Sequence, residues 1–153
     1  MALDLSTMNA DYKICTYDDS VHREETISLW ERVNGYEAAH NKPSLVLDIK
    51  LAVRDGLVFL ALRDNKIVGT VMGGYDGRRG WLYSVVVHPD YRKLGIGSML
   101  VRHVEQALES LGCLKVNLQI MDGNEAVSAF YESLGYGVEK RVSMGKRIGN
   151  IHQ

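Results

Sequence analysis

The stretch with the clearest chemical potential joins an apolar run to the start of an amphipathic segment. Residues 85–98 contain the basic pair Arg92 and Lys93, followed by Gly95 and Gly97. Backbone N–H groups in the first turn of a helix lack partners within the helix and carry partial positive charge. Glycines let a ligand approach the backbone there, and the two cations add positive charge. The sequence therefore predicts a cradle for a phosphate or pyrophosphate group.

The same loop has two other interpretations, a plain turn and a dinucleotide-binding site. A plain strand-to-helix turn with solvated basic side chains stays open on spacing alone. A dinucleotide site fits poorly, because Leu100 stands where its fingerprint needs a third glycine and an antiparallel meander precedes the loop. The sequence also contains no GxxxxGK motif followed by Ser or Thr, which excludes a Walker loop.

Metal and thiol chemistry are not indicated by the sequence. Cys15 and Cys113 have no CxxC spacing, and the five histidines form neither an HExxH nor an HxxxH pair. We therefore expect no metal. The two cysteines are expected to be small buried side chains in a reducing compartment.

Composition favours one globular domain. The chain has 153 residues, of which 46% are hydrophobic, and a net charge of -1 that argues against a nucleic-acid partner. Its apolar runs are far shorter than the roughly 18 residues of a membrane span, and the N-terminus lacks a signal-peptide pattern. We expect a cytoplasmic protein with no membrane partner, a polar tail at 1–11 and a single domain at 12–153.

Hydrophobic periodicity predicts the elements that must position the loop. The expected strands are 12–17, 57–62, 67–75, 81–87 and 115–120, with one or two more within 136–144; the expected helices are 24–33, 44–54, a long one from Ile96 to Leu111, and 126–134. Short links make the three middle strands antiparallel, and the unit over 81–120 should be parallel and right-handed. The predicted fold is α/β, layered, with a mixed and mostly antiparallel sheet.

At the loop the chain resembles the GNAT superfamily of acetyltransferases, whose central helix opens with R/Q-x-x-G-x-G/A. That pattern stands here as Arg92-Lys93-Leu94-Gly95-Ile96-Gly97. A second family element follows at the usual distance, as Asn124-Glu125-Ala126 and then Phe130-Tyr131-Glu132-Ser133-Leu134-Gly135-Tyr136. The resemblance covers residues 12–148. The glycine-rich stretch 72–77 and the late 145–147 are similar to a small bacterial subgroup of uncharacterised members.

The resemblance implies an acyl-CoA N-acyltransferase fold with helices on both faces of the sheet. It implies transfer of an acetyl group from acetyl-CoA to a primary amine, of a small molecule, a peptide or a protein, by direct attack in a ternary complex. Backbone groups of the loop would hold the pyrophosphate, and the strand before it would hold the pantetheine arm. The implied coenzyme-binding residues are Val85, Val86, Val87, Arg92, Lys93, Leu94, Gly95, Ile96, Gly97, Ser98, Asn124, Phe130 and Tyr131.

The resemblance also gives Tyr131 a catalytic role, protonation of the departing thiolate. From the pattern alone, Tyr131 is a core aromatic at helical spacing with Val127 and Leu134, and Asn124 is a helix N-cap. Asn124 and Tyr131 are seven residues apart, about two helical turns, so both lie along one face of the expected helix. That face would follow the pantetheine arm toward its thioester.

The general base is the missing part of the pattern. Many family members carry a glutamate where this chain has Tyr83. A free α-amine, with a reference pKa of about 7.7–8.0, needs less help than a lysine amine near 10.4, which favours an α-amine or small-molecule acceptor. A water relay to Glu31, Glu37 or Asp76 is equally open. The acceptor is expected to meet Glu37, Tyr75, Asp76 and Tyr83.

A non-catalytic function stands beside the enzymatic one. The missing carboxylate base favours an acyl-CoA-binding sensor or an interaction module, whereas Tyr131 and the intact loop favour an enzyme. Homodimers are frequent in the family that the chain resembles, but no residue pattern here specifies one.

Overall fold

The computed structural model describes residues 11–35 and 39–149. The chain divides into two compact units, residues 1–118 and 119–153. The first unit holds a sheet with helices, and the described part of the second holds one helix. Of the tail expected at 1–11, all but Asp11 lies outside the described residues.

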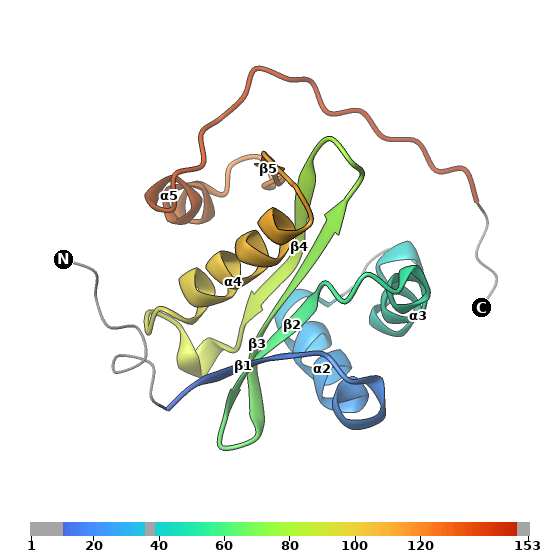
Figure 1. The fold of residues 1–153 in the computed structure, drawn as a ribbon, viewed down its shortest axis with the longest axis vertical. Helices are drawn as coiled ribbons and strands as arrows, with labels where there is room; N and C mark the ends of the chain where they lie inside the picture. Colours follow the sequence, from blue (N-terminus) through green and yellow to red (C-terminus); the bar gives the residue numbers. More distant parts are fainter. Residues whose placement is uncertain (1–10, 36–38, 150–153) are drawn as a thin grey trace. The chain divides into compact units, whose positions relative to one another are not determined.

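The first unit is organised around a five-stranded sheet with the strand order β1-β2-β3-β4-β5 (Figure 1). The strands are β1 (Lys13–Thr16), β2 (Val58–Arg63), β3 (Lys66–Tyr75), β4 (Gly80–Val87) and β5 (Val116–Asn117). The first four pair antiparallel, and β4 pairs with β5 in parallel. This arrangement confirms the predicted mixed sheet with one parallel step.

Helices cover both faces of this sheet, as Figure 1 shows for the first unit. The helical elements of this unit are α2 (Asp19–Asn34), η1 (Ala39–Asn41), α3 (Pro43–Val53), η2 (Pro89–Tyr91) and α4 (Ile96–Ser110). One face is covered by α4 and the other by α2 and α3, where Trp30, Leu47 and Met72 belong to one buried cluster. The second unit contains α5 (Glu125–Ser133). None of the described helices is long and apolar enough to cross a membrane.

Three predictions about the helices and strands were wrong. Helix α2 begins at Asp19, five residues before the expected position 24, because the Asp18 carboxylate accepts a hydrogen bond from the Ser20 N–H at 3.0 Å and caps the helix there. Strand β5 has two residues rather than six. The strands expected within 136–144 are not formed in the described part of the second unit, which holds no other strand to take their backbone hydrogen bonds.

Glycines of β3 face helix α4 and let it pack closely on the sheet. A Cβ atom at Gly69 would stand 2.8 Å from Leu100 Cδ1, and one at Gly73 would stand 2.6 Å from Val104 Cγ2. Leu100 and Val104 are both fully buried. The small residues of β3 therefore serve the close approach of α4, and this contact fixes where the N-terminus of α4 stands.

Gly73→Ala tests this contact. The added methyl group overlaps Val104, so the Val104 side chain or α4 must shift, and we expect the free energy of unfolding to fall by about 1–3 kcal/mol. Gly137→Ala is the matched control, because no atom lies within 4 Å of the position of its Cβ. Urea unfolding of both variants measures the difference. Equal stability of Gly73→Ala and the parent protein would contradict the close approach.

Candidate active site

The predicted phosphate loop runs from the end of β4 to the start of α4. After Val87 the chain forms the single turn η2, and Arg92 is extended. Two left-handed residues then redirect the backbone into the helix, Lys93 with φ 64° and Gly95 with φ 83°. The left-handed region costs a glycine little, which explains Gly95, whereas Lys93 adopts it against the preference of a side-chain-bearing residue.

The N-terminus of α4 leaves several backbone donors open. Gly95 is the N-cap, and no side chain in the described part of the chain caps the helix. The first helical hydrogen bond runs from the Met99 N–H to the Gly95 carbonyl at 3.1 Å, so the N–H groups of residues 96–98 precede the ladder. Arg92 and Lys93 are exposed beside them, whereas the Ile96 side chain is buried in the core. This geometry suits an anion.

A buried histidine organises the turn that leads into the loop. His88 is 5% exposed, and its Nδ1 accepts a hydrogen bond from the Asp90 N–H at 3.1 Å. Its ring meets Tyr91 edge-on at 5.4 Å, and its Nε2 lies 3.3 Å from Arg32 Nη1. Burial, and then the positive charge of Arg32, lower the pKa of His88 below its usual value. The imidazole therefore holds the turn in its neutral form.

Further cations gather around this turn. The Tyr91 ring lies under Arg63, whose Cζ is 5.9 Å from its centroid, and under Lys66, whose Nζ is 5.5 Å away. Lys66 and Arg92 also act on the His88 imidazole as nearby positive charges, against which Asp90 is the one opposing acid. The region beside the loop is therefore electropositive, which favours an anionic ligand.

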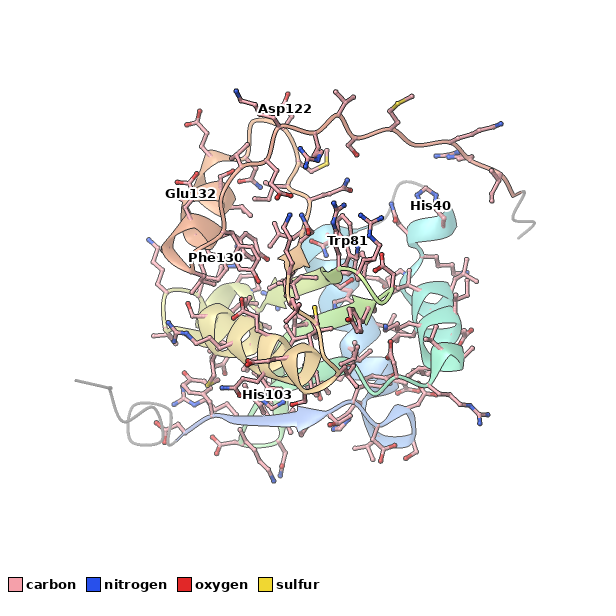
Figure 2. All side chains as sticks on the ribbon, turned by 45° about the horizontal axis from the view of Figure 1, so that its top comes forward. His40, Trp81, His103, Asp122, Phe130 and Glu132 are labelled. Atoms are coloured by element: carbon pink, nitrogen blue, oxygen red, sulfur yellow. The ribbon has the colours of Figure 1, made fainter. Side chains whose placement is uncertain are left out.

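Strand β4 carries a bulge before it reaches the loop. Thr70 pairs with Val86 and Met72 with Tyr83, so β4 has one more residue than β3 over this interval. Ser84, within the bulge, has φ 48°. The parallel ladder to β5 joins only Gly80 to Val116 and Trp81 to Asn117, with Trp81 labelled in Figure 2. Beyond Trp81, no described strand of the first unit pairs with β4 on the β5 side.

The backbone of Val87 faces this side of β4. The His88 N–H donates to the Val68 carbonyl on the β3 side at 2.8 Å, and backbone groups of successive strand residues point in opposite directions. In agreement, the Val87 carbonyl accepts a hydrogen bond from Arg92 Nε at 3.3 Å rather than from β3. Val86 instead places its side chain in the buried cluster under α2. The backbone of Val85 and Val87 was the part of this strand expected to meet a ligand.

A buried hydrogen-bond relay behind the bulge escaped sequence analysis. The Trp30 indole Nε1–H donates to the Thr70 hydroxyl at 2.9 Å, and that hydroxyl donates to the Ser84 carbonyl at 2.9 Å. Thr70 is fully buried, and Trp30 is 4% exposed. The signal in the sequence was Thr70 itself, the one Ser or Thr in β3.

The structure separates the residues expected at the acceptor side. A Cβ on Gly74 would stand 3.3 Å from the Tyr83 ring and 3.9 Å from Lys50 Nζ, so Tyr83 lies on the α3 face of the sheet. The Tyr75 hydroxyl instead approaches the Gly112 carbonyl at 3.4 Å, beyond the end of α4. Tyr75 and Tyr83 therefore do not form one wall. The fourth candidate, Glu37, lies outside the described residues.

Neither Asp76 nor Tyr83 is suited to act as the general base. Backbone N–H groups of Arg79 and Arg78 bind the Asp76 carboxylate at 2.8 and 2.7 Å and lower its pKa, which stabilises the ionised form and weakens it as a base. Burial, and then the nearby charge of Asp76, raise the pKa of Tyr83, which keeps its hydroxyl protonated. Of these two candidates, Tyr83 thus offers a proton donor and Asp76 a carboxylate that is already hydrogen-bonded.

The second unit positions Asn124 and Tyr131 on α5. The Asn124 side chain accepts a hydrogen bond from the Val127 N–H at 3.3 Å and caps the helix, as its pattern predicted. Tyr131 is buried, and its ring meets Phe130 at 4.9 Å and Tyr136 at 5.7 Å; Figure 2 labels Phe130 on this helix. Burial raises the pKa of Tyr131 to about 12. Its hydroxyl thus remains in the proton-donating form at neutral pH.

Within the described ranges, no group of three or more His, Cys, Asp or Glu side chains is placed to bind a metal ion.

The sequence is similar to acetyltransferases in both a family model and individual bacterial relatives. A model of the acetyltransferase (GNAT) family matches residues 19–136. An acetyltransferase of Sodalis glossinidius (strain morsitans) is 38% identical over 139 residues, which cover 90% of this chain and 95% of that protein. An uncharacterised N-acetyltransferase of Yersinia pestis is 39% identical over 125 residues, which cover 82% of this chain and 88% of that protein.

Solved structures share the fold. Glucosamine-6-phosphate N-acetyltransferase from Arabidopsis thaliana superposes with a TM-score of 0.67 at 23% identity, over 90% of this chain and 99% of that one. An aminoglycoside N-acetyltransferase in complex with CoA superposes with a TM-score of 0.72 at 17% identity, over 89% of this chain and 94% of that one. At these identities the similarity concerns the arrangement of helices and strands.

His88→Asn tests the neutral imidazole at the head of the loop. The lowered pKa of His88 means that the unfolded chain binds a proton more readily than the folded one, so stability is lost as pH falls below about 6.5. Asn can accept the Asp90 N–H without titrating, and we expect a smaller loss of stability between pH 7.5 and 5.5. Urea unfolding at both pH values measures it.

His40→Asn is the control for replacing a histidine with asparagine, because His40 is exposed. Burial also lowers the pKa of His103, which therefore contributes to the pH dependence that remains in His88→Asn. A pH dependence identical to that of the parent would mean that the His88 imidazole accepts its proton in the folded protein without cost.

Proposed function

The chain belongs to the GNAT family of acetyltransferases, and from this premise we propose that it transfers the acetyl group of acetyl-CoA to a primary amine by direct attack within a ternary complex. The observation that carries the proposal is the uncapped N-terminus of α4, which stands directly after a strand whose ladder ends at Trp81. The first feature suits a pyrophosphate, and the second suits an extended ligand with amide groups.

The residues of the first unit fit acetyl-CoA, which is the acetyl-donating substrate. We assign the pyrophosphate to the open N–H groups of residues 96–98, with Arg92 and Lys93 adding charge. The pantetheine amides would bind the outward backbone groups of Val85 and Val87. In the structure, Arg92 Nε donates a hydrogen bond to the Val87 carbonyl. A pantetheine N–H that donated to this carbonyl instead would free the Arg92 guanidinium to bind the phosphates.

The proposed reaction needs little from the protein beyond position and charge. The amine nitrogen attacks the acetyl carbonyl carbon, and the negative charge that develops on oxygen would be stabilised by a backbone N–H at the β4 bulge. As the carbon–sulfur bond breaks, the sulfur leaves with the electron pair and takes the Tyr131 proton. The proton that the nitrogen loses passes to water, and Tyr131 regains a proton from water.

The acceptor follows from the missing base. Asp76 is a weakened base and Tyr83 is protonated, so we propose that the amine reaches the site neutral or loses its proton to water. An α-amine with a pKa of about 7.7–8.0 does so more readily than a lysine near 10.4. We therefore propose an α-amine or small-molecule amine. The names of two structural neighbours, a glucosamine-6-phosphate and an aminoglycoside N-acetyltransferase, add amino sugars to this class.

We propose that the enzyme works in the cytoplasm, where thiols stay reduced, which is in keeping with Cys15 and Cys113 as free cysteines. The proposed partners are acetyl-CoA and the amine, with no nucleic acid and no membrane. A homodimer also stays a proposal, for which sedimentation velocity is the direct measurement.

Gly97→Val tests the coenzyme site. Acetyl-CoA should raise the thermal unfolding temperature of the parent protein, and NAD or ATP should do much less, because only the folded loop binds the coenzyme. The valine side chain would block close approach to the backbone and weaken acetyl-CoA binding at least tenfold, about 1.4 kcal/mol, measured by calorimetry. Gly137→Val is the matched control. Stabilisation by NAD alone, or unchanged affinity of a folded Gly97→Val, would refute the assignment.

Tyr131→Phe tests the proton donor. We expect turnover to fall by roughly 10²-fold with nearly unchanged acetyl-CoA affinity, because the hydroxyl acts chiefly as charge develops on sulfur. Thiol release measures turnover, with the acceptor taken from a panel of free-N-terminal peptides, amino acids, polyamines and amino sugars. Tyr136→Phe, which alters the neighbouring ring, is the control. Normal turnover of Tyr131→Phe, with chemistry rate-limiting, would leave Tyr131 a core residue.

A further inference from the structure

We propose that Thr70 is a positioning residue for acetyl transfer, which holds the Ser84 carbonyl so that the Val85 N–H points to the side of β4 that β5 leaves unpaired. This inference rests on the proposed function, because that N–H would meet the acetyl oxygen of acetyl-CoA. Thr70 itself touches neither substrate.

The Thr70 hydroxyl both accepts and donates a buried hydrogen bond. It accepts one hydrogen bond, from the Trp30 indole at 2.9 Å, and donates its single proton to the Ser84 carbonyl at 2.9 Å. Thr70 is fully buried and Trp30 nearly so, which shields both bonds from competition with water. The direction of the Ser84 carbonyl is thus fixed from the α2 face of the sheet.

One peptide unit links the direction of the Ser84 carbonyl to that of the Val85 N–H. The Ser84 carbonyl and the Val85 N–H belong to the same planar trans peptide, so they point in opposite directions. Thr70 lies on β3, and the carbonyl turns toward it. The Val85 N–H therefore points away from the Thr70 hydroxyl. On the side of β4 opposite to β3, the ladder to β5 has already ended at Trp81, which leaves room for a ligand oxygen to accept from this N–H.

The left-handed backbone of Ser84 needs a further interaction to hold it. Ser84 has φ 48°, a left-handed value that an L-residue with a side chain adopts at a cost. The register shift between Thr70 and Met72 places this residue within the bulge, where the ladder to β3 is interrupted. A side-chain hydrogen bond to the bulged carbonyl replaces the missing ladder bond. Without it, the peptide unit is free to rotate, and the N–H loses its direction.

The carbonyl stretch of bound acetyl-CoA reports this direction without any acceptor. We would record infrared difference spectra of acetyl-CoA labelled with ¹³C at the acetyl carbonyl, bound to the parent protein. A hydrogen bond from the Val85 N–H should shift the band to lower wavenumber than in water. The shift should disappear in Thr70→Val, which keeps the side-chain shape, and remain in Thr70→Ser, which keeps the hydroxyl.

Thr26→Val is the matched control for removal of a buried hydroxyl. Thr26 is also fully buried, but its Oγ1 has no hydrogen-bond partner in the described structure. We expect Thr26→Val to keep the carbonyl shift of the parent. In the free protein, the indole N–H resonance of Trp30 should move in Thr70→Val and stay in place in Thr70→Ser, which tests the relay without coenzyme.

A measurement on the parent protein covers the case in which Thr70→Val does not fold. The Val85 N–H resonance should move further on addition of acetyl-CoA than of CoA, because only acetyl-CoA carries the carbonyl. Equal movement, or a carbonyl shift that survives in folded Thr70→Val, would overturn the positioning role and leave the proposed function intact. Failure of acetyl-CoA to bind the parent protein would overturn the proposed function itself.

Discussion

The close approach of α4 to β3 is the constraint on which the rest of the first unit depends. Gly69 and Gly73 leave no side chain between strand and helix, so Leu100 and Val104 fill that space. With the helix fixed this near, the residues between Val87 and Ile96 must turn sharply, which they do through the η2 turn and the left-handed Lys93 and Gly95. The open N–H groups of α4 therefore stand directly after the end of β4.

The bulge in β4 lies where the ladder to β5 has ended. The two strands pair over two residues only, up to Trp81, and Ser84 then redirects the chain. The device is held from the opposite face of the sheet, through Thr70 and Trp30. The core under α2 and the backbone facing the ligand side are thus parts of one hydrogen-bonded structure.

Local patterns were predictable from the sequence, and long-range polar contacts were not. The loop at 92–98 and the antiparallel meander were predicted because glycines, charges and short turns act between neighbouring residues. The relay joins residues 40 and 14 positions apart, which look like an ordinary core tryptophan and a strand threonine. Likewise, the face on which Tyr75 and Tyr83 lie depends on pairing register. The strands expected within 136–144 needed a neighbouring strand that no local pattern reveals.

The left-handed Ser84 also bears on how the protein avoids aggregation. A sheet edge with unpaired backbone groups invites a strand from another molecule to add to it. A foreign strand that pairs with β4 beyond Trp81, where the ladder to β5 has ended, meets the extra residue of β4 at Ser84, where the regular spacing of donors and acceptors is broken. Strand addition therefore stops after a few bonds, while a short ligand that needs only one or two of them is unaffected. The kink that opens the edge to a small molecule closes it to another chain.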